Sequence, residues 1–462
     1  MNSSEEASLN VSEMMDRLGY SYEMVKFRQQ MTKERPVTWR NNLAETIVVT
    51  GGKGEGTALY CESDVDCMYI ADDVICADNP DLFIDRENVT LFKTERQETP
   101  PGYTLLKMVR FGGKSYEDQI RLSILESNTG TLYLSNQLFT NAIEMTDRPN
   151  RFRDGYISEE TSGPSTPSSN EYQTFDEVSC FTCSCPDILV NWLSRSRNHA
   201  WPSLDTIHEI SRLDGHVVPV GFKGSSNSDR EWRICYSLAE LHLFKTLGDT
   251  QLKIYILLKQ IAKSVLQPIC KEITSYVMKN IVLWVCESRN ASVFKNEMLM
   301  RILIDALLIL KLSISENSLP SYMIPDRNIF AGRLDIYQRN QLTRLIEDLL
   351  KDGKNMFLRI GRFREAMLLV SMVPNTFKKY CEKRDKVESL MLMMGRIRAE
   401  AFRPGMSVRE VNNLSWRNEL YCSMWMQINV LIRFDHQALR QAGMTDEEIG
   451  DLWAKRLNQF LS

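Results

Sequence analysis

Residues 46–70 read TIVVTGGKGEGTALYCESDVDCMYI, and this stretch decides the fold. Thr46–Thr50 is a short β-branched run that predicts a strand, and the glycine-rich turn Gly51–Gly56 follows at once. A second predicted strand begins at Asp66, and Asp64 lies two positions earlier. Residues i and i+2 of a strand point to the same face. Two carboxylates on one face repel each other unless a cation lies between them, so the pattern predicts a metal site.

A third carboxylate would complete the ligands for two metal ions. Asp176 is the best candidate, because it opens a further predicted strand, Thr174–Thr182, in which Glu177 would point to the opposite face. Magnesium suits these groups, with manganese as an alternative, because it takes hard oxygen ligands and shares them with substrate phosphates. The glycines of Gly51–Gly56 let backbone N–H groups approach phosphate oxygens. The plainer interpretation is a solvated strand end beside an ordinary turn.

The composition is that of an ordinary soluble globular protein, with 43% apolar and 25% charged residues in 462 positions. The net charge of −4 argues against a protein that coats nucleic acid, but it leaves room for a local basic groove. The 11 cysteines are scattered, and we find no secretory signal, so we expect reduced thiols and a cytoplasmic or nuclear protein, with the cytoplasm as our prediction. Charged residues interrupt the apolar stretch Met298–Ile314, which predicts a buried helix rather than a membrane span.

Strand-like segments fill the first half of the chain and helical patterns fill the second, so the predicted fold class is α+β. The apolar spacing of residues 8–40 predicts a helix that ends before Pro36, and the Ser-, Thr- and Pro-rich residues 161–170 predict an exposed loop. We divide the chain into an N-terminal helical region at 1–45, an α/β core at 46–235 with a loop at about 145–172, a helical lobe at 236–370 and a C-terminal helical extension at 371–462.

Several sequence blocks occur in a familiar order. Gly51–Ile70 resembles the signature of the cyclic GMP-AMP synthase-like receptors, the enzyme branch of the Mab-twenty-one nucleotidyltransferase family. Other blocks that look like those of the family are EWRICYS at 231–237, YILLKQ at 255–260, ITSYVMKNIVLW at 273–284 and LPSYMIPDRNIF at 319–330. The resemblance covers residues from about 40 to about 370. It implies a nucleotidyltransferase-fold sheet lobe, then a helical lobe, with the active site in the cleft between them.

The resemblance also implies roles for single residues. It matches the metal-binding acids to Asp64, Asp66 and Asp176. It matches the nucleotide-binding positions to Gly51, Gly52, Arg233, Lys259, Ser275, Tyr276 and Lys279. Arg233 and Tyr276 correspond to residues that stack on a base and Lys259 to one that touches phosphates, while Lys279 falls one helical turn after Ser275. From the residues alone, Arg233 and Lys279 would be surface ion pairs and Tyr276 a core residue.

The sequence departs from the family at two places. Position 52 is Gly where the family usually has Ser, so one hydroxyl for a phosphate is missing. The zinc ribbon of the vertebrate DNA-sensing enzyme has no counterpart, because Ser237–Leu258 contains no cysteine and only His242. A different Cys/His cluster consists of Cys180, Cys183, Cys185, His199, His208 and His216. Its spacing fits no standard zinc finger, and buried strand cysteines are the interpretation we prefer.

Family enzymes are typically switched on by a ligand, often double-stranded nucleic acid, on the face opposite the active site. Candidate activator-binding residues are Lys26, Arg28, Lys33, Arg35, Arg359 and Arg362. A further basic cluster consists of Lys378, Lys379, Lys383, Arg384 and Lys386. Such groups attract phosphates without regard to sequence, and duplex RNA is recognised by shape without a zinc clamp. The alternative is a set of solvated helix faces, because acidic residues are interleaved.

The function implied by the resemblance is a magnesium-dependent enzyme that joins ATP and GTP into a cyclic dinucleotide, with cyclic GMP-AMP as the expected product. Duplex RNA is the expected activator, and the product would act on a STING-type receptor in innate immunity. A non-catalytic scaffold of the same fold is the first alternative. A nucleotidyltransferase that makes linear products is the second.

Overall fold

The computed structural model describes residues 3–32, 35–36, 45–153, 157–158, 165–169, 174–403 and 406–461. Side chains are described throughout these residues except at 3, 35–36, 147–153, 157–158, 166, 168–169 and 408. The described strands are β1 (Arg35–Pro36), β2 (Glu45–Val49), β3 (Val65–Ala77), β4 (Thr90–Glu95), β5 (Tyr103–Arg110), β6 (Ile124–Glu126), β7 (Leu132–Leu134), β8 (Ile157–Ser158), β9 (Thr166–Ser169), β10 (Thr174–Ser184), β11 (Gly215–Val218) and β12 (Glu231–Cys235).

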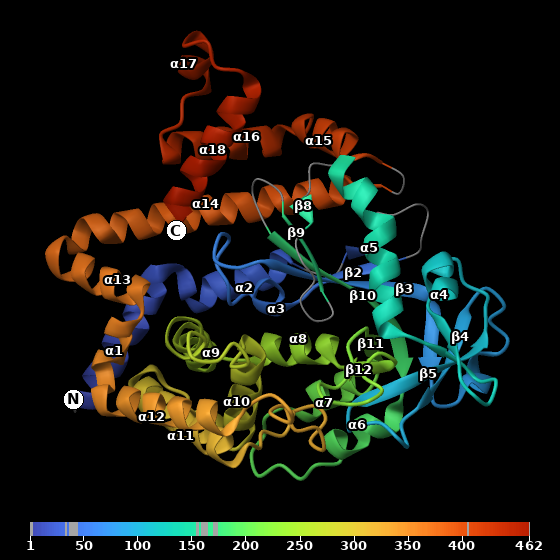
Figure 1. Ribbon diagram of the computed structural model, residues 1–462. Helices are drawn as coiled ribbons and strands as arrows, with labels where there is room; N and C mark the ends of the chain where they lie inside the picture. Colours follow the sequence, from blue (N-terminus) through green and yellow to red (C-terminus); the bar gives the residue numbers. More distant parts are fainter. Residues whose placement is uncertain are drawn as a thin grey trace.

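The strands belong to one sheet organised around β3 (Figure 1). β10 runs parallel to β3 along one edge. Along the other edge, β2 pairs with the first part of β3 and β4 with its last part. The path from β4 through β5, β12 and β11 returns to β10, so these strands close into a ring with β3. β3 therefore has neighbours on both edges along nearly its whole length, which fixes its register firmly.

Helices cover the sheet and form the second half of the chain (Figure 1). The described helices are α1 (Ser3–Met15), α2 (Tyr22–Met31), α3 (Gly51–Gly54), α4 (Glu117–Leu122), α5 (Asn136–Arg153), α6 (Pro186–Leu193), α7 (Leu204–Ile210), α8 (Ser237–Thr246), α9 (Asp249–Ile261), α10 (Ser275–Glu287), α11 (Leu299–Glu316), α12 (Ile336–Asp352), α13 (Gly361–Met372), α14 (Pro374–Ala401), α15 (Val408–Trp416), α16 (Glu419–Ile432), α17 (His436–Gln441) and α18 (Asp446–Leu461). The predicted α+β class is confirmed.

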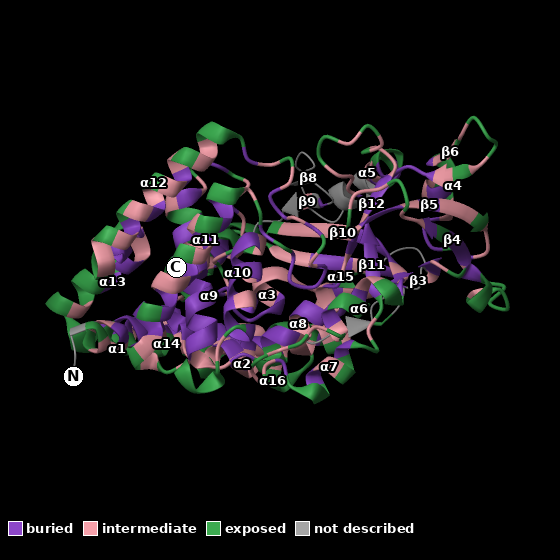
Figure 2. Ribbon diagram, turned by 90° about the horizontal axis from the view of Figure 1, so that it is seen from below, coloured by how far each residue is buried: buried purple, intermediate pink, exposed green. Residues whose placement is uncertain are grey.

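One hydrophobic core joins the sheet to the helices. It contains Phe181 and Trp232 from the strands together with Phe244, Tyr255 and Ile281 from α8, α9 and α10. α9 is buried on all sides from its second to its tenth residue, as Figure 2 shows by its purple ribbon. A helix that is buried all round belongs to the interior of a large fold, so α9 holds its polar C-terminal end at a fixed place beside the sheet.

α11 confirms the buried helix predicted at 298–314. Its inner face is buried, while Leu308 and Leu312 are exposed on the outside. Across the described helices, none has the length and apolar character that a membrane span requires.

The N-terminal segment differs from the single helix predicted for residues 8–40. A π-helical turn, Asp16–Tyr20, separates α1 from α2, because Gly19 has a φ of 91° and breaks the helical path. A Cβ at Gly19 would lie 3.0 Å from Leu59, in the segment that connects β2 to β3. The break therefore brings the N-terminal helices into contact with that segment.

The prediction of a loop at about 145–172 is wrong in part. α5 continues to Arg153, because Phe139 and Ile143 bury one of its faces in the core. Within the Ser- and Thr-rich stretch predicted as a loop, Thr166–Ser169 forms β9 and pairs with β10. Pairing satisfies backbone groups that the composition alone suggested would meet water.

Candidate active site

The carboxylates of Asp64, Asp66 and Asp176 lie at the same end of two paired strands. β10 runs parallel to β3, and Asp176 is the register partner of Asp66. Asp64 is the residue before β3, and it accepts a hydrogen bond from the hydroxyl of Thr174 at the start of β10. The three acids singled out in the sequence are therefore neighbours in space.

The carboxyl group of Asp66 has a strongly perturbed pKa. Burial, together with the nearby carboxylates of Asp176, Glu55 and Asp64, raises its pKa to about 6, and the ammonium of Lys279 opposes the rise. Both effects disfavour the charged form of an acid. The site thus holds negative charge at a cost that a bound cation would relieve.

These donors fit a hard divalent cation in chemistry, because magnesium prefers carboxylate oxygens. Within the described part of the chain, no three His, Cys, Asp or Glu side chains converge closely enough to enclose a metal ion. Magnesium is usually held by one or two carboxylates together with water and substrate phosphates, so a closed cage is not required. Asp66 and Asp176 fit this open arrangement, and Asp64 would join it by turning away from Thr174. Glu177, on the other face of β10, is hydrogen-bonded to a tyrosine of β3.

The glycine-rich turn lies directly against the acids. Gly51 has a φ of 56°, and a Cβ there would lie 1.9 Å from a carboxylate oxygen of Asp66, so only glycine fits. A Cβ at Gly52 would lie 2.9 Å from Nζ of Lys259. Lys259 reaches the turn from α9 and donates a hydrogen bond of 3.2 Å to Oγ1 of Thr57. The turn, the lysine and the carboxylates therefore meet at one place.

Lys279 is ion-paired in the interior rather than at the surface. Its Nζ lies 2.7 Å from Glu55 and 2.9 Å from Glu240. Burial by itself would lower the pKa of Lys279, but the two carboxylates hold the pKa well above its usual value. Sequence reasoning missed Glu55, because an acid inside a glycine-rich turn is more often solvated. A nucleotide contact by Lys279 stays a prediction.

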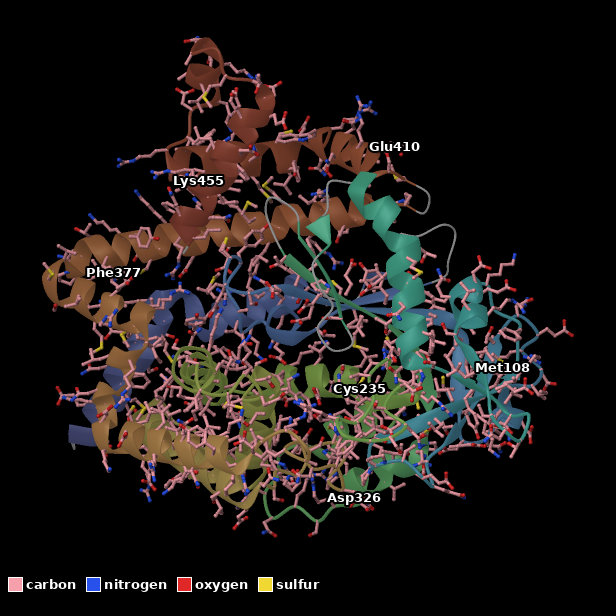
Figure 3. The ribbon with its side chains drawn as sticks, in the orientation of Figure 1. Met108, Cys235, Asp326, Phe377, Glu410 and Lys455 are labelled. Carbon is pink, nitrogen blue, oxygen red and sulfur yellow. The ribbon has the colours of Figure 1, made fainter. Side chains whose placement is uncertain are left out.

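A second cationic group consists of Arg233 of β12 and Arg327 of the segment after α11. Figure 3 labels Cys235 at the end of β12 and Asp326, which precedes Arg327. The guanidinium of Arg327 lies 5.7 Å from the ring centre of Tyr103 and 5.9 Å from that of Tyr276. Burial and the charge of Arg327 lower the pKa of Arg233. Among the described residues, neither guanidinium forms an ion pair or a hydrogen bond to a side chain.

Arg233 and Tyr276, both predicted to contact a base, therefore lie in one cluster with Arg327 and Tyr103, which the sequence did not single out. Two neighbouring guanidinium groups without a carboxylate, Arg327 buried and Arg233 half-buried, disfavour each other unless an electron-rich ligand comes between them. Gly102 supports the arrangement, because a Cβ there would lie 2.8 Å from Cδ of Arg327.

One comparison with known proteins bears on this arrangement. Residues 250–350 match the family model of the Mab-21 protein HhH/H2TH-like domain. The match relates the chain to the Mab-21 proteins at a coarse level, and hence to nucleotidyltransferase-like proteins. The Mab-21-like region runs from the start of α9 almost to the end of α12. It contains Lys259, Arg327, the ion-paired Lys279, and Ser275 and Tyr276 at the start of α10, but none of the three acids.

The strand cysteines are buried, as predicted. Cys180, Cys183 and Cys185 have exposures of 0%, 1% and 3%. Burial lowers the pKa of His216 to about 4, so this side chain is neutral near neutral pH. All eleven cysteines of the chain lie in the described residues and are free thiols.

The predicted activator-binding residues differ in their burial and in their partners. The prediction for Arg28 is wrong, because its side chain is buried and ion-paired with Glu388 at 2.7 Å and cannot form a surface contact. Arg359 is exposed and paired with Asp352. The remaining members of the set are Lys26, which donates to a backbone carbonyl, Arg362, which is half-buried, and Lys33 and Arg35, whose side chains lie outside the described residues.

Asp66→Asn should stabilise the metal-free fold at neutral pH. The folded-state pKa of about 6 exceeds the ordinary 3.8, so ionised Asp66 destabilises the fold above about pH 6 and costs nothing below 3.8, where both states are protonated. The gain is up to roughly 3 kcal/mol and should shrink as the pH falls from about 7.5 to about 4.5. Thermal unfolding in the presence of a chelator measures it. Asp81→Asn, at an exposed position, is the matched control, and an equal gain in both variants would contradict the assignment.

Gly51 and Gly52 should respond differently to a larger residue. Gly51→Ala should abolish nucleotide binding, because the new Cβ would displace Asp66 from a backbone that disfavours L-residues. Gly52→Ser should keep binding or improve it, since only the flexible end of Lys259 and Cβ of Ala58 at 3.0 Å must give way. A well-aligned hydroxyl would tighten phosphate binding by roughly 10- to 100-fold. Affinity for a fluorescent triphosphate decides between these outcomes, and equal losses in both variants would contradict them.

Proposed function

We propose that this chain is a metal-dependent nucleotidyltransferase that joins two nucleoside triphosphates into a cyclic dinucleotide. The observation that carries the proposal is the pairing of Asp66 with Asp176 beside the Gly51–Gly52 turn. Paired carboxylates next to a phosphate-accommodating backbone and a lysine are what phosphoryl transfer requires. The relationship to Mab-21 proteins supports a nucleotidyltransferase-like protein, and the cyclic product is the further step of the proposal.

In each transfer, a ribose hydroxyl oxygen attacks the α-phosphorus of the second nucleotide, and the bond to the β-phosphate oxygen breaks. Pyrophosphate leaves, and we assign the hydroxyl proton to Asp176, whose carboxylate lies beside that of Asp66. Lys259 would hold the phosphates over the glycine turn, where Gly51 and Gly52 leave room for backbone donors. Bound magnesium ions would add electrostatic stabilisation of the phosphate oxygens. A second transfer of the same kind closes the ring.

ATP and GTP are the proposed substrates, and the arginine–tyrosine cluster is the proposed base site. Tyr276 offers an aromatic face for stacking, and Arg233 and Arg327 offer donors to ring nitrogen and carbonyl acceptors. Ser275 is exposed at the first turn of α10, next to Tyr276. In this proposal the turn and Lys259 contact the phosphates, while Arg233 of β12, Arg327 and Tyr276 of α10 contact the base.

A second candidate is a non-catalytic scaffold of the same fold. Two observations favour it: the ammonium of Lys279 is already occupied by Glu55 and Glu240, and the described acids form no closed metal cage. A polymerising enzyme with linear products shares the acidic residues and is separated from the cyclase by its product.

The enzyme assay uses labelled ATP and GTP with magnesium or manganese, and chromatography of the products. Wild type should form a product that resists phosphatase, because a cyclic dinucleotide has no terminal phosphate, and Asp66→Asn and Asp176→Asn should form none. A product that phosphatase degrades would indicate a linear polymer. No product under any activating condition, from a protein that binds triphosphate, would favour the scaffold.

We further propose that duplex RNA activates the enzyme and that its product signals to a STING-type receptor. Exposed basic residues that could contact RNA lie on α14, where Lys378, Lys379, Lys383 and Lys386 all face solvent. A helix face of this kind supplies phosphate contacts whose strength falls steeply with salt.

Lys379→Glu combined with Lys383→Glu should weaken activation by duplex RNA while leaving triphosphate affinity unchanged. The log–log salt slope should fall in magnitude by about 0.9 for each phosphate contact removed, as a guide taken from B-form DNA. Yield against RNA concentration at several salt concentrations measures this. Lys93→Glu combined with Lys114→Glu reverses two exposed charges on the far side of the sheet and is the matched control. Equal losses in both doubles would indicate a net-charge effect instead of a binding surface.

A further inference from the structure

The segment between β2 and β3 folds back on itself beside the acids. This nucleotide loop, residues 50–64, begins at the glycine turn and ends at Asp64. Nζ of Lys53 donates to the carbonyl oxygens of Leu59 and Tyr60, the latter at 2.6 Å. The N–H groups of Thr57 and Ala58 donate to the carbonyl of Gly52 at 2.9 and 3.0 Å. These bonds are local, so they shape the loop but do not attach it to the rest of the protein.

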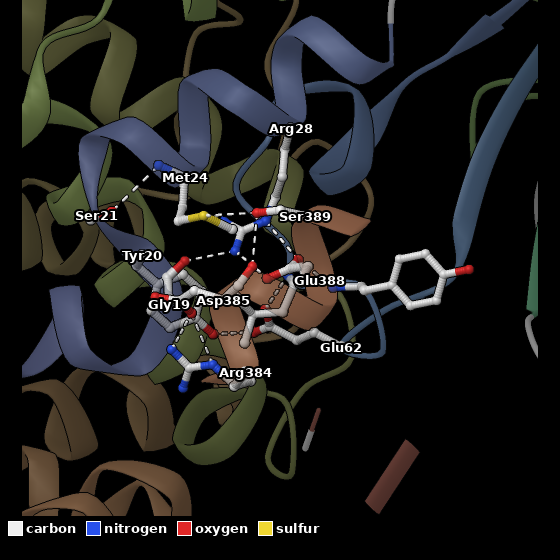
Figure 4. A network of polar contacts seen from close by, with 12 residues as sticks. Gly19, Tyr20, Ser21, Met24, Arg28, Glu62, Arg384, Asp385, Glu388 and Ser389 are labelled. Carbon is white, nitrogen blue, oxygen red and sulfur yellow. Dashed lines mark hydrogen bonds and ion pairs between the residues drawn. The ribbon is translucent and has the colours of Figure 1, made fainter. Parts of the chain in front are cut away.

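Lys259 and Lys279 contact the loop at Thr57 and Glu55, and a further attachment comes from α14, which is far away in the sequence. Glu388 lies 328 positions after Tyr60, and its Oε1 accepts from the N–H of Tyr60 at 2.8 Å. The same carboxylate receives two hydrogen bonds from Arg28, at 2.8 Å from Nε and 2.7 Å from Nη2 (Figure 4). The side chains of Arg28 and Glu388 are 3% and 2% exposed, so solvent hardly weakens the pair.

Arg28 extends the attachment to two more segments. Its Nη2 donates to the carbonyl of Gly19 at 2.7 Å, at the break between α1 and α2 (Figure 4). Its Nη1 lies 3.4 Å from the carbonyl of Gly56 in the loop. α2 packs directly on the loop as well, because a Cβ at Gly56 would lie 2.4 Å from the carbonyl oxygen of Val25. One buried ion pair therefore joins α2, the helix break, the loop and α14.

A second contact from the C-terminal segment lies next to the first. Tyr60 packs against the hydrophobic cluster that contains Val387, Met424 and Leu461. Sγ of Cys61 lies 3.1 Å from Oδ1 of Asn458 on α18. α14 to α18 lie outside the residues that match the Mab-21 domain. The C-terminal segment, outside the Mab-21-like region, thus contacts the loop at two consecutive residues.

A buried ion pair adds little net stability compared with apolar residues of the same size, because desolvation offsets the attraction. The ion pair instead fixes geometry, because a carboxylate that accepts from three donors holds those donors in fixed relative positions. We propose that Glu388 is a positioning residue for the nucleotide loop, so that the C-terminal segment is part of the active-site scaffold. The proposal rests on the proposed function in that the loop is taken to bind triphosphate.

Lys53 gives this role a chemical signature. Burial lowers its pKa to about 8, while Glu388, Cys61 and Glu62 oppose the lowering and Arg28 adds to it. The charge of Glu388 therefore helps to keep Lys53 protonated, with its hydrogen bonds to the loop carbonyls intact. Removing that charge should move the loss of loop structure to lower pH.

The first variant is Glu388→Gln, which keeps the size and one acceptor oxygen but removes the charge. We expect weaker triphosphate binding and a higher KM, by roughly 10- to 100-fold for a lost charge-assisted bond, with little change in kcat. The alkaline limb of the pH profile should shift to lower pH. Glu400→Gln is the matched control, since it breaks a surface pair with Arg396 on the same helix. Equal triphosphate affinity and an equal pH profile in Glu388→Gln and wild type would overturn the proposal.

The second variant separates position from stability. Arg28→Met with Glu388→Met replaces the ion pair by apolar groups, which should keep or raise the melting temperature while leaving the N–H of Tyr60 without its acceptor. We expect a stable protein that still binds triphosphate weakly. A double variant that regains both stability and affinity would show a purely structural pair and overturn the proposal. Equilibrium binding of a fluorescent triphosphate is the readout. If wild type binds triphosphate but forms no product, the proposed cyclase activity is refuted, while the effect of Glu388 on triphosphate binding can still be measured.

Discussion

The parallel pairing of β3 with β10 is the constraint on which the site depends. It sets Asp66 opposite Asp176 in a register fixed by neighbours along both edges of β3. Two carboxylates held at this separation cannot both ionise freely, which is why burial and like charge raise the pKa of Asp66 to about 6. The closed ring of strands prevents the acids from moving apart, so the repulsion must be relieved by cations brought to them.

The helical lobe supplies those cations on rigid elements. Lys259 comes from the end of the fully buried α9 and Lys279 from α10. Arg327 comes from the segment after α11, packed on Gly102 and between two tyrosine rings. The acidic residues come from the sheet and most of the basic residues from the helices. The same side chains therefore attract the sheet to the helices and form the candidate site. The shared hydrophobic core gives this arrangement a fixed geometry.

Sequence patterns predict the parts of the site that local rules govern. The β-branched run and the glycine turn predict β2 and the turn after it, and the acids singled out by their spacing lie together at one end of β3 and β10. Their role as metal ligands stays a prediction. Buried partners were out of reach, because nothing near Glu55 shows that Lys279 approaches from α10. Arg28 was misread for the same reason: an arginine on an amphipathic helix is usually solvated, and its partner Glu388 is 360 positions away. β9 was missed because its strand character comes from pairing, not composition.

The same reasoning explains why the N-terminal and C-terminal segments cannot be treated as independent of the core. Gly19 breaks the N-terminal helices at the point where Arg28 needs the Gly19 carbonyl as an acceptor. α14 passes over this break with Glu388 directed at Arg28 and at the loop, while its lysines face solvent on the outside. A polyanion bound to these lysines would therefore contact the same helix that holds the loop. The proposed control of catalysis by a ligand would then need no separate domain, because α14 would carry the proposed binding surface on one side and the positioning carboxylate on the other.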